Sequence, residues 1–444
     1  MTRWKEYIEI LYAAEEKPKV CPLENEEEVD KNDIGPLFIT QEIEYGIKSL
    51  KNGKSEGIDG IPGELIKVLK GNTIEELKNL SNKAYETGQW HIDYTTSIMK
   101  TLKKKMNTNH CEEHITISLI SYASKIILKI LYTRLLNKAK EYIGWDQFGF
   151  MKGRGTRDAI GVLRIICERS LAINKDVFIC FIDYEKAFDR VNWIKMMSIL
   201  KEIGVDYRDR KAIWELYINQ SVTVIIDGEL TERATIGRGV RQGGLLSTIL
   251  YNIYAEAMMK EALESSNDGI RVGGLDISAD RYADDQAMIS NTIAGLQRLL
   301  DLLNETGKRY GMKINIKKTK VLRVSKLKRS SNSIKIKIDG IEVKQVKIFC
   351  YLGSIISEDG KCESDIRCRL GMAKTKFIEN IQLLTGRSTA IETKKNIIKT
   401  LIWSIALYAS ECWTMRKVDI KRIEAFEMWC WRKMLKIKYT DHIT

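Results

Sequence analysis

Residues 177–189 read VFICFIDYEKAFD, and this stretch decides the fold. Its first six residues, Val177 to Ile182, are all apolar, and an apolar run of this length predicts a strand that is buried on both faces. The run ends at Asp183, and a helical pattern begins near Lys186. The predicted strand therefore presents a carboxylate at its end. Considered alone, an aspartate in such a place is more often a helix cap or a turn residue than a metal ligand.

A second acidic site follows further along the chain, where residues 282–285 read YADD and residues 287–289 are apolar. This pattern predicts a hairpin with two acids at its tip. Adjacent aspartates repel each other and favour a cation, although an exposed turn is the commoner explanation for an isolated pair. If the hairpin lies beside the first strand, Asp183, Asp284 and Asp285 form an oxygen cage suited to Mg²⁺. Two such ions about 4 Å apart polarise a 3′-hydroxyl and stabilise a pyrophosphate leaving group.

The composition is that of a globular protein with a polyanionic partner. Of the 444 residues, 44% are hydrophobic and 30% charged, which argues against disorder and membrane residence. The formal charge is +13, and basic side chains bind polyanions because they neutralise phosphates and release counterions. Residues 1–10 lack the apolar core of a secretion signal, and apolar runs such as 401–409 are too short to span a bilayer.

The cysteines indicate reduced thiols inside a cell. Nine of them stand at scattered spacings with no Cys-x-x-Cys pair. His110, Cys111 and His114 lie close together, but no fourth ligand stands at zinc-binding spacing, so a zinc site is not predicted.

The order of predicted elements indicates a mixed α/β (α+β) fold. Helices are predicted in residues 1–89 and over 118–142, and short strands alternate with helices from about 177 to 357. Residues 363–431 return to amphipathic helix. Their aromatic residues are predicted to belong mostly to the core: Trp403, Tyr408, Trp413, Trp429 and Trp431.

The two acidic stretches, 181–189 and 282–285, resemble motifs A and C of reverse transcriptases. In the right order along the chain, residues 239–243 (GVRQG) resemble motif B, residues 311–320 (GMKINIKKTK) motif D, and residues 351–353 (YLG) the motif E primer grip. Three upstream segments look like the non-LTR (LINE-type) members of the family: residues 57–62 (GIDGIP), 147–150 (QFGF) and 153–159 (GRGTRDA). The chain thus resembles the polymerase region of a LINE-type retrotransposon reverse transcriptase, without the endonuclease domain.

The resemblance implies a right-hand polymerase fold with fingers, palm and helical thumb. We expect an N-terminal helical extension leading into the fingers at 1–89, the reverse transcriptase domain at 90–357, and the thumb with the C-terminal segment at 358–444. The implied reaction is two-metal transfer of a nucleotide from a dNTP to a primer 3′-hydroxyl on an RNA template.

The same resemblance implies the cofactors and partners. The cofactors are two Mg²⁺ ions, with Mn²⁺ as an alternative, and the partners are an RNA template, a DNA primer or nicked target DNA, and dNTPs. The full-length element would supply an endonuclease. We expect a nuclear and cytoplasmic protein that is neither secreted nor bound to a membrane.

The resemblance also assigns roles to individual residues. Asp183, Asp284 and Asp285 are the implied catalytic residues, and with the backbone carbonyl of Tyr184 they would bind the metals. The implied nucleotide-binding residues are Phe188, Gln242, Gly243, Lys318 and Lys320, with Phe188 as a steric gate against the ribose 2′-hydroxyl, although packing alone would also explain a Phe there. Lys318 and Lys320 belong to a tract, residues 311–347, with twelve basic residues against two acids. The implied primer grip is Tyr351, Leu352 and Gly353.

One departure from the family pattern keeps other functions open. Family members usually carry Arg-Pro-Ile-Ser-Leu in the fingers, whereas residues 115–119 read ITISL here, so Ile115 replaces an arginine expected near the triphosphate. A charge-assisted phosphate contact is worth roughly 1.5–3 kcal/mol. The alternative function is therefore a weakened remnant that binds RNA–DNA hybrid without efficient synthesis. A group II intron maturase or a viral replicase is a third hypothesis. The YADD sequence and the LINE-type segment before motif A disfavour the replicase. What argues against the maturase is that no recognisable maturase extension follows the expected thumb.

Overall fold

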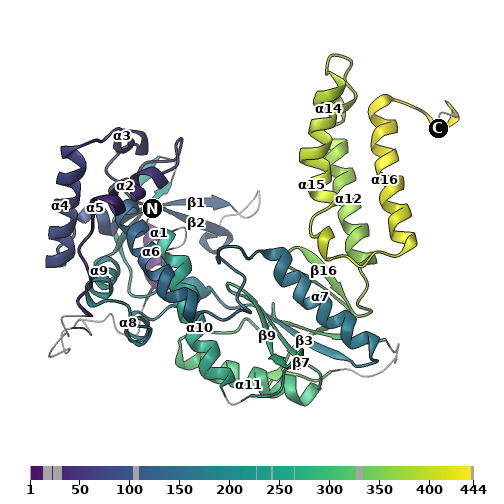
Figure 1. Ribbon diagram of the computed structural model, residues 1–444, viewed down its shortest axis with the longest axis horizontal. Coiled ribbons are helices and arrows are strands. Elements are labelled where there is room, and N and C mark those ends of the chain that lie inside the picture. The colour runs from purple at the N-terminus through teal and green to yellow at the C-terminus, as the bar shows by residue number, and fades with distance from the viewer. Residues whose placement is uncertain are drawn as a thin grey trace. The chain divides into compact units, whose positions relative to one another are not determined.

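The computed structural model describes residues 2–13, 23, 33–103, 110–226, 228–241, 244–264, 266–326 and 334–441 (Figure 1). The chain forms two compact units, and each unit gathers segments that are far apart in sequence. Unit 1 contains residues 1–150, 184–265 and 302–314, and unit 2 contains residues 151–183, 266–301 and 315–444. The predicted boundaries after residues 89 and 357 stay predictions.

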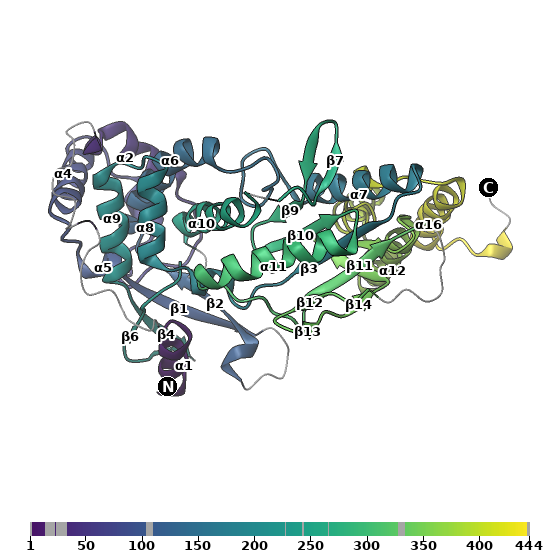
Figure 2. The same cartoon turned by 90° about the horizontal axis from the view of Figure 1, so that it is seen from below.

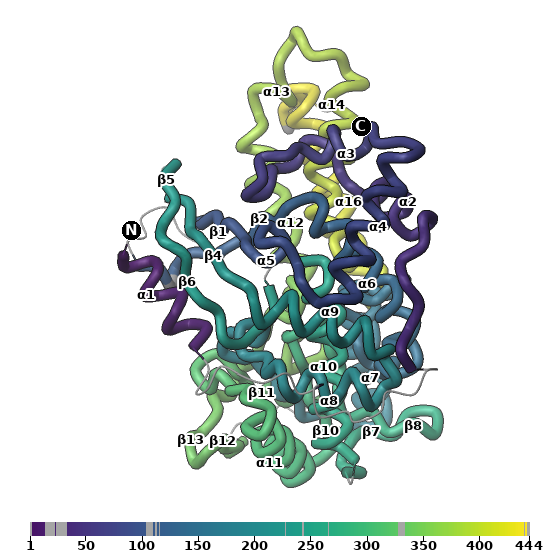
Figure 3. Tube along the Cα trace, turned by 90° about the vertical axis from the view of Figure 1, so that its left-hand side faces the viewer, coloured from purple at the N-terminus to yellow at the C-terminus, as the bar shows by residue number. Residues whose placement is uncertain are grey.

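Unit 1 combines a bundle of helices with a five-stranded sheet. Its helices are α1 (Thr2–Leu11), α2 (Thr40–Ser49), α3 (Gly63–Lys67), α4 (Asn72–Thr87), α5 (Ile92–Thr95), α6 (Tyr122–Tyr142), α8 (Trp193–Glu202), α9 (Tyr207–Ile218) and α10 (Leu245–Leu263), with 3-10 turns at Cys111–Glu113 and Ala187–Arg190. Its strands are β1 (Thr96–Lys103), β2 (His114–Leu119), β4 (Ser221–Ile226), β5 (Glu229–Leu230) and β6 (Ala234–Thr235), in the order β2-β1-β4-β5 with β6 also on β4. Helix α1 lies beside β4 and β6 (Figure 3).

Unit 2 is built on a second five-stranded sheet, in the order β14-β11-β3-β10-β9 (Figure 2). The strands are β3 (Val177–Ile182), β9 (Ala279–Tyr282), β10 (Asp285–Ser290), β11 (Lys320–Val324) and β14 (Gln345–Val346). The described part of the unit also contains three separate two-stranded hairpins: β7 (Ile270–Val272) with β8 (Leu275–Ile277), β12 (Lys337–Ile338) with β13 (Ile341–Glu342), and β15 (Ile348–Tyr351) with β16 (Ser354–Ser357). Helix α7 (Thr156–Ala172) contacts β9. Of helix α11 (Ile293–Arg309), the part up to residue 301 belongs to this unit and buries three leucines along one face: Leu296, Leu299 and Leu300.

The C-terminal part of unit 2 is helical, as predicted. It contains α12 (Glu363–Glu379), α13 (Ile381–Thr385), α14 (Ile391–Ile397), a π-helical segment (Ile398–Trp403), α15 (Ser404–Ala406), a 3-10 turn (Ser410–Cys412), α16 (Lys417–Leu435) and a last 3-10 turn (Tyr439–Asp441). Helix α12 packs against α15 and α16 (Figure 1). Of the aromatics predicted to be core, Trp413 is buried, Tyr408 is half-buried, and Trp403, Trp429 and Trp431 are half-buried against the same apolar cluster.

The strand predicted at 177–182 is confirmed residue for residue, and all six of its side chains are buried. The helix predicted over 118–142 is wrong at its start, because Ser118 and Leu119 end strand β2. The helix begins at Tyr122, after the Ser121 side chain accepts a hydrogen bond from the Ser124 amide (3.2 Å). A serine at this place satisfies a free helical N–H, which fixes the start. Over the described ranges, no helix has an apolar stretch long enough to cross a bilayer.

Candidate active site

Strand pairing brings the two acidic segments together in unit 2. β10 runs antiparallel to β3 with Gln286 opposite Ile182, so Asp285 and Asp183 follow at the same edge of the sheet. Adjacent strands lie about 4.8 Å apart. β9 and β10 form the predicted hairpin, with Tyr282 opposite Asp285 and Asp284 in the turn between them. The three acids therefore meet although two distant parts of the chain supply them.

The backbone of Asp183 is fixed by the loop before β11. The Asn315 amide donates to the Asp183 carbonyl (2.7 Å), and the Asp183 amide donates to Thr319 Oγ1 (3.3 Å). The Thr319 side chain is fully buried. Both hydrogen bonds hold the backbone at the end of β3, so they fix the point from which the Asp183 carboxylate extends.

Charge is concentrated around the three carboxylates. The Lys318 ammonium lies 3.4 Å from both Asp183 oxygens. Desolvation raises the pKa of Asp285 to about 6, and the carboxylates of Asp284 and Asp183 act in the same direction, while Lys318 opposes them. The pKa of Asp284 is also raised, first by desolvation and then by Asp183. Grouping the acids is therefore unfavourable without a cation.

A cavity of about 240 Å³ opens beside the acids. Its lining combines the acidic and basic side chains with aromatic rings: Phe181, Ile182, Asp183, Asp285, Gln286, Lys318, Phe349 and Tyr351. Phe349 stacks on Phe181 with ring centroids 4.0 Å apart, and Tyr351 lies 5.4 Å from the same ring. The β15–β16 hairpin thus forms one wall of the cavity.

The residues present fit a hard divalent cation. Asp183 Oδ2 is buried and accepts no hydrogen bond within the described residues, although the Lys318 ammonium lies 3.4 Å away as its ion-pair partner. Over the same residues, no group of three or more His, Cys, Asp or Glu side chains is close enough to hold an ion by itself. Mg²⁺ prefers carboxylate oxygens and completes its octahedron with water and substrate phosphates, so the carboxylates at this edge are ligands of the type that the ion takes.

The family whose pattern the chain matches is described as reverse transcriptase (RNA-dependent DNA polymerase). The match covers residues 67–356, well over half of the chain and all three acids. The chain belongs to the reverse transcriptase family.

Relatives of this reverse transcriptase chain come from mobile elements. A 115 kDa protein of the type-1 retrotransposable element R1DM of Drosophila melanogaster is 23% identical, over 81% of this chain and 33% of that protein. The RNA-directed DNA polymerase from mobile element jockey of Drosophila funebris is 24% identical, over 83% and 40%. The chain thus spans well under half the length of either relative. The predicted non-LTR type is confirmed.

Telomerases are among the solved structures that are similar to the reverse transcriptase chain. Apo telomerase from Candida tropicalis shares 13% sequence identity and a TM-score of 0.46, with 83% of this chain and 67% of that one covered. The right-hand polymerase fold predicted above is the fold of the family to which the chain belongs.

The implied nucleotide-binding residues of the reverse transcriptase fall into different places. Phe188, in unit 1, stacks on Tyr251 with centroids 4.3 Å apart and stays half-exposed. Gly239 packs tightly against the backbone next to Phe188, because a Cβ at position 239 would lie 2.8 Å from the Asp189 carbonyl oxygen. Gln242 and Gly243 lie outside the described residues. Their roles and that of Phe188 stay predictions.

The two motif D lysines bind different partners. Lys318 reaches Asp183, whereas the Lys320 ammonium donates to the backbone carbonyls of Thr319 (3.1 Å) and Lys317. Desolvation lowers the pKa of Lys320, and the Lys344 ammonium adds to this. Tyr184 is buried and pairs with Ile314 in unit 1, and a metal contact by its carbonyl stays a prediction.

The motif E tyrosine is anchored below the YADD turn. Tyr351 is 3% exposed, and its hydroxyl donates to Asp280 at Oδ1 (3.0 Å) and at the backbone oxygen (3.3 Å). Asp280 lies in β9, four residues before Asp284. Sequence reasoning missed Asp280 and Phe349, because no local pattern tells a buried polar support or a cavity wall from ordinary strand residues.

Proposed function

We propose that the chain is an RNA-directed DNA polymerase of a non-LTR retrotransposon. It would transfer a nucleotide from a dNTP to a primer 3′-hydroxyl on an RNA template. The primer oxygen attacks the α-phosphorus, and pyrophosphate leaves with the electrons of the broken P–O bond. The observation that carries the proposal is the strand register that brings Asp183 beside Asp285 and the YADD turn.

The chain's own residues would act as follows. Asp183, Asp284 and Asp285 would hold two divalent ions, together with the Tyr184 carbonyl. When bound, these ions would lower the pKa of the 3′-hydroxyl and neutralise the leaving pyrophosphate. The Lys318 ammonium lies 3.4 Å from the Asp183 carboxylate, and it would move from this carboxylate to an incoming phosphate. A lysine also has a proton to give to the leaving group.

The selection of substrates follows from two further assignments. Phe188 would exclude ribonucleotides by crowding the 2′-hydroxyl, and the Tyr351-Leu352-Gly353 segment would hold the primer end. RNA template, DNA primer or nicked target and dNTPs are the proposed partners, and the full-length element would supply an endonuclease. A nuclear and cytoplasmic location fits such substrates.

Primer extension on poly(rA)/oligo(dT) with Mg²⁺ tests the proposal. We expect extension by the wild type and its loss in Asp284→Asn, since an amide replaces a negative ligand while keeping its shape. Asp276→Asn, at an exposed position of strand β8, is the matched control and should extend normally. Extension that survives in Asp284→Asn would refute the assignment of the acids.

A second candidate function is a weakened remnant that binds RNA–DNA hybrid. Ile115, where the family usually has arginine, favours it. Here the wild type would bind hybrid and fail to extend, and Ile115→Arg should restore extension. Failure of this rescue would remove the missing arginine as the cause.

A further inference from the structure

The turn between β15 and β16 has an unusual backbone. Tyr351 pairs with Ser354, so Leu352 and Gly353 alone make the turn. Their φ angles are +47° and +83°, which is the left-handed region at both central positions. This geometry suits the twist of a hairpin and favours Asn or Gly at both positions. Leucine is a bulky residue that rarely adopts it, so the turn is strained at Leu352.

Two side chains from the C-terminal helical region hold this turn by its carbonyl groups. The Tyr408 hydroxyl donates to the Leu352 carbonyl (2.9 Å), and the Arg369 guanidinium donates to the Gly353 carbonyl. The two side chains also support each other, because the Arg369 guanidinium lies 4.3 Å from the centre of the Tyr408 ring. A Cβ on Gly353 would come within 3.2 Å of Arg369 and 3.4 Å of Tyr408. Position 353 therefore needs glycine for its space as well as its φ angle.

Side chains of helix α12 form hydrogen bonds with consecutive residues of the β15–β16 hairpin. Asp365 accepts hydrogen bonds from Ser354 Oγ (2.7 Å) and the Ile355 amide (3.0 Å), directly after the turn. Asp365 and Arg369 stand four residues apart, so they share one face of the helix. That face therefore binds three consecutive residues of the hairpin, 353–355, through hydrogen bonds.

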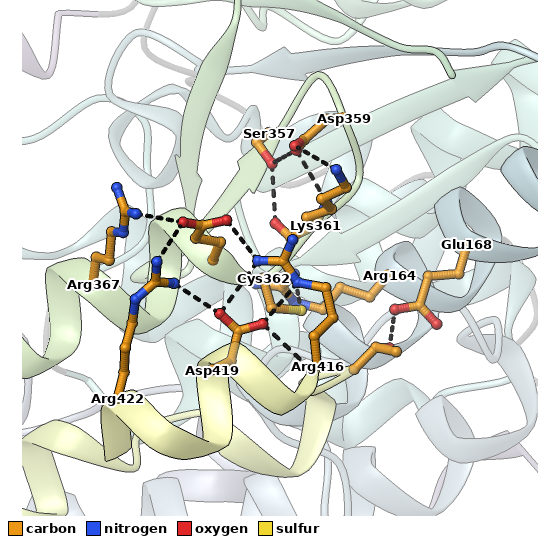
Figure 4. A network of polar contacts seen from close by, with 12 residues as sticks. Arg164, Glu168, Ser357, Asp359, Lys361, Cys362, Arg367, Arg416, Asp419 and Arg422 are labelled. Carbon is orange, nitrogen blue, oxygen red and sulfur yellow. Dashed lines mark hydrogen bonds and ion pairs between the residues drawn. The ribbon is translucent and has the colours of Figure 1, made fainter. Parts of the chain in front are cut away.

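The start of α12 is itself fixed by a network of charges (Figure 4). Glu363 binds Arg367, Arg416 and Arg422, and the last two also bind Asp419, which is 1% exposed. The support of the turn therefore extends into α16.

We propose that Tyr408 and Arg369 are positioning residues that set where the primer's terminal nucleotide lies. The inference rests on the proposed function and names two residues outside the motifs that suggested it. The strained turn and the cavity wall belong to one short hairpin, since Phe349 and Tyr351 line the cavity that contains Asp183 and Asp285. Movement of the turn would move that wall, and the primer end with it.

The test uses Tyr408→Phe, which keeps the ring beneath Arg369 and removes the hydroxyl, with its bonds to the Leu352 carbonyl (2.9 Å) and to Thr156 Oγ1 (3.3 Å). Thr414→Val is the matched control, because the Thr414 hydroxyl comes from the same region and binds Glu168 on α7 instead of the turn. A template–primer with 2-aminopurine at the primer 3′ end reports the placement of the terminal base without any catalysis. Extension assays give kcat, the KM for dNTP and the Kd for template–primer.

We expect Tyr408→Phe to change the 2-aminopurine signal and to lower kcat by about 10- to 100-fold, since small misplacements of reacting atoms have effects of this size. The KM for dNTP should stay within about twofold, and Thr414→Val should match the wild type. Adding Leu352→Gly to Tyr408→Phe should restore most of the loss, because glycine adopts the turn without strain. A purely structural role for Tyr408 gives no reason for this rescue.

An unchanged 2-aminopurine signal in Tyr408→Phe would overturn the proposal, as would equal effects in Tyr408→Phe and Thr414→Val. If the wild type binds template–primer and never extends it, the proposed function fails, while the fluorescence comparison still decides the role of Tyr408. If Tyr408→Phe does not fold, Arg369→Lys decides, because it keeps the charge and loses the planar contact with the ring. The proposal then requires the same displaced signal.

Discussion

The buried carboxylate of Asp365 organises the junction between α7, β16 and α12, and its removal should be strongly destabilising. Asp365 is 1% exposed and binds Arg164, which is 5% exposed, at 3.1 Å. It also accepts from Ser354 Oγ, the Ile355 amide and the Trp413 indole (2.9 Å).

Asp365→Ala would leave a buried arginine without its counter-charge. Breaking one side of a buried ion pair costs about 3–5 kcal/mol. Counted separately, four hydrogen bonds at about 1 kcal/mol each give a similar total. Both routes predict a loss of stability that is large for one side chain.

Hydrogen–deuterium exchange of peptides from α7 and α12 measures this loss locally, which suits a chain with two compact units. Since 1.4 kcal/mol corresponds to tenfold, exchange in Asp365→Ala should accelerate by about two to almost four orders of magnitude. Glu363→Gln, which weakens half-exposed ion pairs on the same helix, should have a much smaller effect. Replacing the pair together, in Arg164→Met with Asp365→Leu, should recover much of the stability. A change below about threefold in Asp365→Ala would refute this reasoning.

Four further outcomes are expected. Bonding to Arg416 lowers the pKa of Asp419 from 3.8, so the stability that Asp419 lends to α16 is present above about pH 4 and lost as the pH falls through the lower folded value; Asp419→Asn should remove this dependence in acid titrations of helix content. Tyr12→Phe removes a 2.8 Å hydrogen bond to Asp189 and should speed hydrogen–deuterium exchange in the 184–191 peptide, by an amount that corresponds to a stability loss of about 1–3 kcal/mol; an unchanged exchange rate would contradict a stabilising role for this bond. Phe188→Ala should raise ribonucleotide incorporation relative to deoxynucleotide by at least about tenfold in competition assays, and an unchanged ratio would remove the steric gate. Binding of RNA–DNA hybrid should weaken with salt, with a negative slope of log K against log salt of about 0.7–0.9 per phosphate neutralised, whereas a flat plot would contradict an electrostatic surface.

The clustering of acids that the proposed reaction needs lowers the stability of the folded protein. Three carboxylates and a lysine meet at one sheet edge, and desolvation, together with the neighbouring carboxylates of Asp284 and Asp183, raises the pKa of Asp285 to about 6. Because the folded pKa lies above the ordinary carboxyl value of 3.8, this group lowers stability as the pH rises through that window. A bound cation would reverse the penalty, which links folding of the site to its ligand.

Much of the chemistry could be predicted from the sequence because it depends on local pattern. The apolar run at 177–182 specifies a buried strand, the YADD tetrapeptide between apolar residues specifies a hairpin tip, and the order of five motifs specifies the family. The basic tract at 311–347 follows from composition alone. These features need only neighbouring residues, so the linear chain already contains them.

Other features depend on which distant segments pack together. A slip of one residue between β3 and β10 would turn the acids to opposite faces, and only the pairing of Ile182 with Gln286 excludes it. The contacts of Tyr351 with Asp280 and of Tyr408 with Leu352 span 71 and 56 residues and have no local signature. The sequence by itself determined which residue types the site contains and the strands that present them. The tertiary structure decided which of them touch, because register and side-chain direction are set by packing across the whole fold.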